Sequence, residues 1–254
     1  MKKPKTISGY DHSVTDACER VLVTLLRSLG PWKKSIFLIG GLTPRYLVKA
    51  RPPAVPPHAG TADVDIVVDL TILTDTEAYR TLEENLRNIG FQQVANEKGV
   101  RQPWRWFIDV DGGRMILEFL ADYPKADAAK VRNLPTDGGV SALNIPHASL
   151  VFDLHDTVEI TAELLGDEGR ATETIRYANI VSFICLKAFA YDDRRERKDA
   201  HDILYCLENY EGGIDGVFDH FALSLATAHE PVIRKALGLL AQRFCDRKAP
   251  DESY

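Results

Sequence analysis

The sequence predicts an α+β fold, in which a mixed sheet flanked by helices is followed by a mostly helical second half. Short apolar runs typical of strands alternate with segments of helical spacing in the first half. The run "RWFIDVDGGRMILEFLAD" has the turn residues of a β-hairpin between two apolar strands. Long segments of helical spacing dominate the later part of the chain. We therefore expect a sheet domain over residues 1–125 and a mostly helical domain over residues 126–254.

The first elements are predicted from apolar spacing, glycine and proline. Apolar residues repeat at helical spacing over 14–29, and a Gly-Pro pair ends this helix. The run "SIFLIGG" is typical of a buried strand that enters a tight turn. We expect "LTPRYLVKA" to be a helix with Thr43 as its cap and Pro44 in its first turn. The four prolines of "RPPAVPPHAG" predict an extended loop over 51–60.

The remaining elements follow the same signals. "ADVDIVVDL" is predicted to be a strand, and "DTEAYRTLEENLRNIG" a helix capped by Asp75 or Thr76 and ended by Gly90. "SLVFDL", "TVEITAELL" and "ETIRYAN" resemble short strands. Two helical stretches follow, "IVSFICLKAFAYDDRRERKDAHDILYCLENY" and "GVFDHFALSLATAHEPVIRKALGLLAQRF", the second with an interruption near Pro231.

Composition narrows the class of protein. The 254 residues are 45% hydrophobic and 27% charged, which is typical of a globular chain and excludes disordered and fibrous classes. The net charge of -6 argues against a protein that coats nucleic acid through its overall field. The four scattered cysteines are expected to be reduced packing residues. No run has the length of a membrane span or a signal-peptide core, so we expect a cytoplasmic protein with no membrane partner.

The stretch "GTADVDIVVDL" places two carboxylates one residue apart at the start of a strand. Side chains alternate along a strand, so Asp63 and Asp65 lie on one face. Two close carboxylates repel each other unless a cation lies between them, and hard oxygen ligands of this kind suit Mg²⁺ or Mn²⁺. The alternative is a solvated strand end with no bound ion.

Two further features favour a metal site. "FLIGGLTPR" contains a strand, a glycine turn and a helix start, whose backbone N–H groups and helix dipole can hold a phosphate. Glu118 lies inside the apolar run "MILEFLAD", where an unpaired charge is costly, although an outward-facing acid on a half-exposed strand explains it equally well. Together these features are typical of a two-metal site for phosphoryl transfer.

These residues resemble the nucleotidyltransferase superfamily that shares the DNA polymerase β palm-like fold, whose signature is a glycine turn followed by D-x-D or D-x-E. In the second half, "IRYANIVSFICLKAFAYDDRRERKDAHDILYCL" is similar to the helical segment with K, then R, then K-D-x-x-D of AbiEii-type toxin nucleotidyltransferases. Proteins of that type belong to type IV toxin-antitoxin and phage-defence systems. The resemblance spans roughly residues 36 to 208. It implies a polymerase β-like mixed sheet, with a helical domain that completes the cleft.

The resemblance implies a role for each matching residue in the first half. Gly40 and Gly41 match the turn that holds the nucleoside triphosphate (NTP), with Arg45 as a phosphate contact. Asp63 and Asp65 match the metal ligands. The Pro-rich stretch lengthens the gap between turn and D-x-D relative to the family pattern, which is expected to alter only a loop.

Further matches lie on a later strand and in the helical half. Glu118 matches the third acid, which in this family binds a metal ion or deprotonates the incoming hydroxyl. Many relatives have Asp at this position, and Asp122 is the alternative candidate for the role. Lys187 and Asp199 match the helical residues that complete the site. From its apolar surroundings alone, Lys187 would be interpreted as a lysine that lays its stem on the core. Lys198 and Asp202 are four apart, which predicts a surface ion pair. The basic run over 194–198 is the patch expected to contact an RNA backbone.

The leading hypothesis is therefore a Mg²⁺- or Mn²⁺-dependent enzyme that moves a nucleoside monophosphate from an NTP to an acceptor hydroxyl and releases pyrophosphate. The resemblance implies tRNA as the acceptor, a toxin or phage-defence role, and a cognate antitoxin protein as partner. One alternative changes the acceptor to a protein hydroxyl or to a small molecule such as an antibiotic, and the acidic net charge mildly favours a cationic small acceptor. Another is a catalytically silent nucleotide-binding interaction module.

Overall fold

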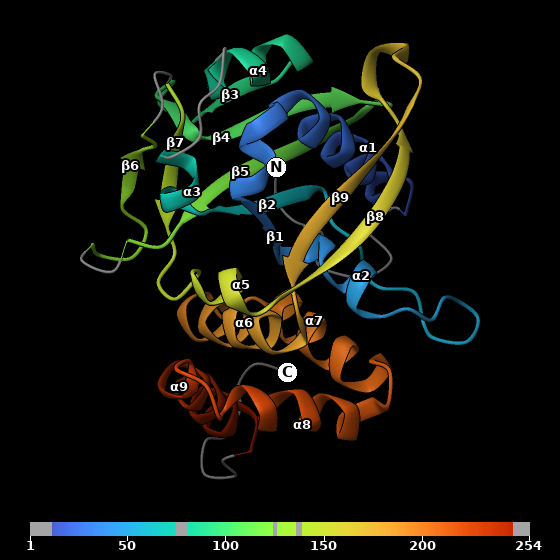
Figure 1. Cartoon of the computed structure of the whole chain (residues 1–254), viewed down its shortest axis with the longest axis vertical. Coiled ribbons are helices and arrows are strands. Elements are labelled where there is room, and N and C mark those ends of the chain that lie inside the picture. Colours follow the sequence, from blue (N-terminus) through green and yellow to red (C-terminus); the bar gives the residue numbers. More distant parts are fainter. Residues whose placement is uncertain (1–11, 75–80, 124–125, 136–138, 246–254) are drawn as a thin grey trace.

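The computed structural model describes residues 12–74, 81–123, 126–135 and 139–245. A mixed sheet with its helices occupies the upper part of Figure 1, and the helices α6–α9 form a separate layer below it. This arrangement confirms the predicted α+β class and the helical C-terminal region. Among the described helices, none combines the length and the apolar character that crossing a bilayer requires.

The strands of the described residues join in one sheet of nine strands, with the order β3-β4-β5-β2-β1-β9-β8; β7 pairs with β5, and β6 with β7. The strands are β1 (Ile36–Ile39), β2 (Asp63–Val68), β3 (Gln92–Ala95), β4 (Arg101–Val110), β5 (Gly113–Ala121), β6 (Val131–Asn133), β7 (Ser141–Asn144), β8 (His155–Glu163) and β9 (Arg170–Ala178). Four of them lie beyond residue 125, so the change from sheet to helices falls after β9. The division into two domains at 125/126 stays a prediction.

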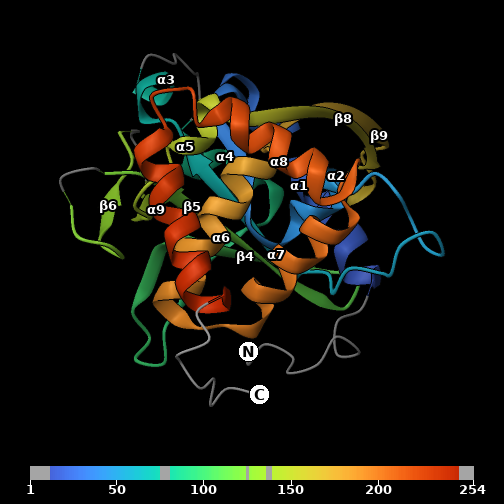
Figure 2. The same ribbon diagram turned by 90° about the horizontal axis from the view of Figure 1, so that it is seen from below.

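The helices lie on both sides of this sheet. They are α1 (His12–Leu29), α2 (Pro44–Leu47), α3 (Leu70–Thr74), α4 (Leu82–Ile89), α5 (Leu150–Asp153), α6 (Ile180–Arg194), α7 (Arg197–Asn209), α8 (Gly213–Ser224) and α9 (Glu230–Leu240). Helices α1 and α4 pack together, and Cys18 of α1 reaches Met115 of β5. Seen from below in Figure 2, α6, α7, α8 and α9 cover the side of the sheet opposite to α1.

The predicted hairpin is confirmed, and side chains along its two strands alternate between the two faces of the sheet. Asp111 and Gly112 both have positive φ, at 51° and 77°, as a two-residue turn between twisted strands requires. Strands β4 and β5 pair through Val110 and Gly113 next to this turn. Alternate residues therefore face α1 or the helical layer. Trp106 is fully buried on the α1 side, whereas its neighbour Phe107 is half-buried on the other.

Three local predictions need correction. Thr43 does not cap α2, since it has helical φ and ψ and makes no side-chain cap bond, and α2 is only four residues long. The run "SLVFDL" contributes the short helix α5, and the carbonyl of Leu154 at its end accepts hydrogen bonds from the Ser182 hydroxyl and the N–H of Asn179 at the start of α6. Helix α4 begins after Thr81, which forms a capping box with Glu84; the predicted caps at 75 and 76 lie outside the described residues.

Other predictions hold. The segment 51–60 contains neither helix nor strand, as its prolines indicate. Gly90 ends α4 in the left-handed region with φ 101°. The helical stretch from residue 180 is confirmed, but it was predicted without a break and is in fact two helices, since Arg195, with φ 53°, ends α6 before α7 begins. The break near Pro231 separates α8 from α9, and Pro231 lies in the first turn of α9.

Candidate active site

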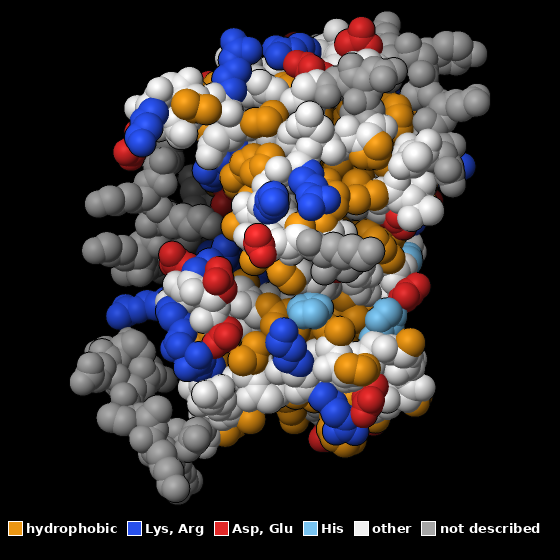
Figure 3. Space-filling model, turned by 90° about the vertical axis from the view of Figure 1, so that its left-hand side faces the viewer, with side chains coloured by type: hydrophobic (Ala, Val, Ile, Leu, Met, Phe, Trp, Pro, Cys, Tyr) orange, Lys and Arg blue, Asp and Glu red, His pale blue; other side chains and the backbone are white. Residues whose placement is uncertain are grey.

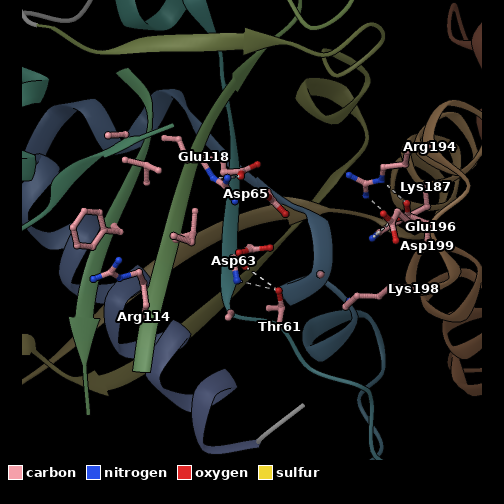
Figure 4. Close-up of a pocket in the computed structure, with 17 residues that line it drawn as sticks. Thr61, Asp63, Asp65, Arg114, Glu118, Lys187, Arg194, Glu196, Lys198 and Asp199 are labelled. Carbon is pink, nitrogen blue, oxygen red and sulfur yellow. Dashed lines mark hydrogen bonds and ion pairs between the residues drawn. The ribbon is translucent and has the colours of Figure 1, made fainter. Parts of the chain in front are cut away.

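A cavity of about 610 Å³ lies between the sheet and the helices α6 and α7 (Figure 4). Its size suits a nucleotide-sized ligand. It is lined by Gly41, Thr61, Ala62, Asp63, Asp65, Val94, Ala95, Arg105, Phe107, Arg114, Ile116, Glu118, Lys187, Arg194, Glu196, Lys198 and Asp199. These residues form three walls: an acidic wall on β2 and β5, a cationic wall on α6 and α7, and a mixed wall on the β3–β5 hairpin region.

The acidic wall brings the predicted acids together. Asp65 pairs in register with Glu118 on the parallel strand β5, and Asp63 pairs with Ile116 two residues away. All three carboxylates line the cavity, and Figure 4 shows Asp63 and Asp65 on the strand that faces the helices. On the far side of Glu118, Nε of Arg105 lies 2.8 Å from Oε1 of the glutamate. Glu118 is therefore already neutralised by one cation, whereas the two aspartates are adjacent on one strand face.

The glycine turn fits against this acidic wall. Gly40 has φ +76°, and a Cβ built on it would lie 1.9 Å from Oδ2 of Asp65. At Gly41 a Cβ would meet Nζ of Lys198 and Oγ1 of Thr61, each at 3.0 Å. The glycines thus allow the backbone to lie against the carboxylate on one side and the ammonium on the other. Because α2 is so short, phosphate contacts here would come from the turn's N–H groups and not from a helix dipole.

The cationic wall is held by buried carboxylates. Nζ of Lys187 donates to Oδ1 of Asp199 at 2.9 Å, and Arg194 donates to the same carboxylate through Nε at 2.7 Å and Nη2 at 2.8 Å. Asp199 is 1% exposed, and these two cations compensate its buried charge. Lys187 and Asp199 thus meet, as the resemblance implies, and both line the cavity opposite the aspartates.

Asp202 is the centre of this network, and sequence reasoning missed it. Its side chain is fully buried and accepts from Nζ of Lys187 at 2.6 Å and from Nζ of Lys198 at 2.9 Å. The predicted pair of Lys198 and Asp202 therefore exists, but it is not a surface pair. His58 of the Pro-rich loop approaches the same carboxylate, with Nε2 2.8 Å from Oδ1. Spacing alone could not reveal this, because an i, i+4 pair looks the same whether it is exposed or buried.

The electrostatics of this cluster follow from burial and pairing. Burial would lower the pKa of Lys187, but the charges of Asp202 and Asp199 outweigh it and raise that pKa. Burial would likewise raise the pKa of Asp202, yet Lys187 and Lys198 hold it well below its usual range. The hydrogen bonds that Arg194 donates to Asp199 raise the pKa of its guanidinium. Lys187, Arg194 and Asp202 are thus charged at neutral pH, and the two cations are fixed beside the cavity.

A group of possible metal ligands also occurs in this region. Within the described ranges, the group of three ligand atoms within 4.8 Å of one another consists of His58, His201 and Asp202. However, Nδ1 of His58 accepts a hydrogen bond from the N–H of Gly60 at 3.1 Å, so neutral His58 carries its proton on Nε2 and donates it to Asp202. A metal on Nε2 would need the opposite tautomer. Asp202 also binds two lysines, so hydrogen bonding explains this group better than a metal ion.

The mixed wall consists of three cross-strand pairs on the cavity side of the hairpin. Arg105 pairs with Glu118, Phe107 with Ile116, and Asp109 with Arg114. The Arg114 guanidinium lies 4.1 Å from the centre of the Phe107 ring. It also donates to Asp109 through Nε at 2.8 Å and Nη2 at 3.0 Å, which fixes its plane. Apart from Glu118, no residue of this wall was assigned a role from the sequence.

Two predicted residues lie elsewhere. Arg45 does not line the cavity; it forms ion pairs with Asp16 at 2.7 Å and with Glu19 at 2.8 Å. Asp122 accepts from the hydroxyl of Ser149 at 2.6 Å and is also absent from the cavity wall. The structure therefore favours Glu118 over Asp122 as the third acid near the aspartates.

The basic run at the junction of α6 and α7 divides between cavity and surface. Arg194 and Lys198 line the cavity, whereas Arg195 and Arg197 are exposed outside it. In Figure 3, Lys and Arg side chains gather along the left edge of the visible face at the level of the helical layer. A polyanion that enters the cavity would meet the positively charged side chains of the protein on this side.

The sequence matches no known protein-family model and no curated protein sequence. An assignment of function therefore depends on the chemistry of the cavity and on the resemblance of its short motifs.

Proposed function

We propose that the protein is a Mg²⁺- or Mn²⁺-dependent nucleotidyltransferase with a polymerase β-like catalytic sheet. The observation that carries this proposal is that an acidic wall and a cationic wall face each other across one cavity. Asp63 and Asp65 lie on one strand face, and Lys187, Arg194 and Lys198 lie opposite them on α6 and α7. A nucleotide bound with its metal ions has both kinds of charge, and few other small ligands need both walls.

The donor set fits a hard divalent ion. Mg²⁺ in nucleotide sites takes one or two protein carboxylates and completes its shell with phosphate oxygens and water. Asp63 and Asp65 supply two such carboxylates, and Gly40 leaves room for the second of them. A bound ion would offset the negative charge of the triphosphate and of the reacting oxygens. Glu118 is adjacent to Asp65 but forms an ion pair with Arg105. The two aspartates are therefore the expected ligands, and Glu118 would become a third ligand only if its ion pair with Arg105 opened.

The residues of the helical wall would position the triphosphate. Asp199 and Asp202 keep Lys187, Arg194 and Lys198 charged and fixed before substrate arrives, so little side-chain ordering remains to be done on binding. Arg194 has a planar guanidinium whose Nη1 is not used by Asp199, which leaves donors for a phosphate. The N–H groups of the Gly40–Leu42 turn, between the two walls, would complete the cradle.

The acceptor and the biological role are further parts of the proposal. The resemblance to AbiEii-type toxins favours tRNA, and the exposed Arg195 and Arg197 beside the cavity suit an RNA backbone. A toxin or phage-defence role and a cognate antitoxin rest on the resemblance alone. A small cationic acceptor is less suited, because Arg105, Arg194 and Lys198 also line the cavity.

The test is transfer of label from each α-labelled NTP, in Mg²⁺, to separated RNA, protein and small-molecule fractions of a cell extract. The variant Asp65→Asn keeps the size of the side chain and removes its charge. Asp156→Asn is a matched control, since Asp156 is an exposed aspartate on strand β8 that does not line the cavity.

We expect label in tRNA-sized RNA for the native protein and the control, and a loss of at least roughly 100-fold for Asp65→Asn. Label in protein or metabolites that depends on Asp65 would keep the enzyme and change the acceptor. Absence of Asp65-dependent label with all four NTPs would refute the proposal and favour a silent nucleotide-binding module.

A further inference from the structure

Phe107 and Arg114 of the mixed wall have no task in metal or phosphate binding. Nucleotidyl transfer needs the acidic wall for metal ions and the cationic wall for phosphates. The third wall offers the planar ring of Phe107, the planar guanidinium of Arg114 stacked on it at 4.1 Å, and the apolar side chains of Ile116 and Val94. This combination of flat and apolar surface is what a heteroaromatic ring binds in proteins.

The position of this wall relative to the aspartates is fixed by strand register. Asp63 pairs with Ile116, and Ile116 pairs with Phe107, so the three residues form one row across β2, β5 and β4. Neighbouring strands lie about 4.8 Å apart, which puts Phe107 roughly 10 Å from Asp63. That separation is comparable to the reach of a nucleotide from its α-phosphate to its base. A phosphate near Asp63 therefore leaves its base close to Phe107.

We propose that Phe107 and Arg114 form the subsite that holds the nucleobase of the incoming NTP, an inference that rests on the proposed function. The stack is fixed before binding, because Asp109 holds the guanidinium plane through two hydrogen bonds and Ile116 lies beside the ring. Arg114 has only donors, so its remaining N–H groups match bases with acceptor edges. Adenine, whose Watson–Crick and Hoogsteen edges each set the amino donor beside a ring acceptor, is the base that this edge suits least.

The experiment compares two probes by titration calorimetry in Mg²⁺: a non-hydrolysable NTP analogue, and inorganic tripolyphosphate, which has the phosphates and no base. The variant Phe107→Leu keeps an apolar side chain and loses the ring, and Phe107→Tyr keeps the ring. Phe218→Leu is the matched control, because Phe218 lies on α8, is 69% exposed and does not line the cavity. Arg114→Lys keeps the charge and loses the guanidinium plane.

For Phe107→Leu we expect analogue binding to weaken by roughly five- to hundredfold, with tripolyphosphate binding unchanged within about twofold. Phe107→Tyr and Phe218→Leu should bind both probes like the native protein, and Arg114→Lys should weaken only the analogue. If Phe107→Leu binds the analogue normally, or weakens both probes equally, the base subsite is refuted while the proposed function stands. If the native protein binds neither probe, the proposed function itself fails, and the base subsite with it.

Discussion

Replacing Gly40 by alanine tests the fit between the glycine turn and the acidic wall. The new Cβ would lie 1.9 Å from Oδ2 of Asp65, whereas ordinary contact begins at 3.4 Å, so the carboxylate must retreat by about 1.5 Å. Misplacement of a catalytic group by 1 Å can cost about 100-fold in rate. The φ of +76° adds strain of about 1–2 kcal/mol for a residue with a Cβ.

The chain offers a matched control for the strain. Gly166 has nearly the same φ, +75°, but a Cβ there would meet no atom within 4 Å. Gly166→Ala should lose about 1–2 kcal/mol in urea unfolding, and Gly40→Ala should lose more, because its Cβ would also lie 2.7 Å from Cγ and 2.9 Å from Cβ of Asp65. Only Gly40→Ala should also lose NTP-dependent labelling, by at least roughly 100-fold, under conditions where both variants remain folded. If Gly40→Ala keeps activity within about threefold of Gly166→Ala, Asp65 does not act from the position described here.

Three other measurements probe the buried network and the thiols. Lys187→Met leaves Asp199 and Asp202 with one fewer cation each and should destabilise the fold by about 3–5 kcal/mol in urea unfolding; a loss below about 1 kcal/mol would contradict the buried-pair interpretation. Burial lowers the pKa of His58 despite Asp202, so its contribution to stability is complete above the unfolded value of 6.5 and is lost as pH falls from there. The free energy of unfolding of the native protein should therefore be lower at pH 5.5 than at pH 7.5, and this difference should be smaller for His58→Asn. Equal differences in the two proteins would argue against this contribution. Burial raises the pKa of Cys18 and of Cys185 to about 12, and Cys206 is also buried, so a thiol reagent at pH 8 should modify the exposed Cys245 alone before denaturation and four thiols after it.

The local parts of the site could be predicted from the sequence because they depend on short-range geometry. Alternation along a strand places Asp63 and Asp65 on one face, and β2 has that form. The hairpin turn follows from Asp111 and Gly112, whose backbone conformations few other residues adopt easily. Helical spacing likewise revealed α6 and α7, although the break at Arg195 carries no signal, since arginine rarely takes a positive φ.

The non-local parts could not be predicted in this way. The neighbour of Asp65 is Glu118 because β2 and β5 pair in parallel, and parallel pairing leaves no trace in either strand's own pattern. The ion pair of Glu118 with Arg105 depends on the same register. Asp202 resembled half of a surface pair, since nothing in its helix shows that His58, from a loop over 100 residues earlier, closes over it.

The most direct test of the proposed metal and triphosphate site is Mn²⁺ binding followed by electron paramagnetic resonance, with and without a non-hydrolysable NTP analogue. We expect the analogue to create a tight Mn²⁺ site in the native protein and in Asp156→Asn, and we expect both Asp63→Asn and Asp65→Asn to abolish it. A site of unchanged affinity in both aspartate variants, or no analogue-dependent Mn²⁺ binding in the native protein, would contradict a nucleotide site built on this strand.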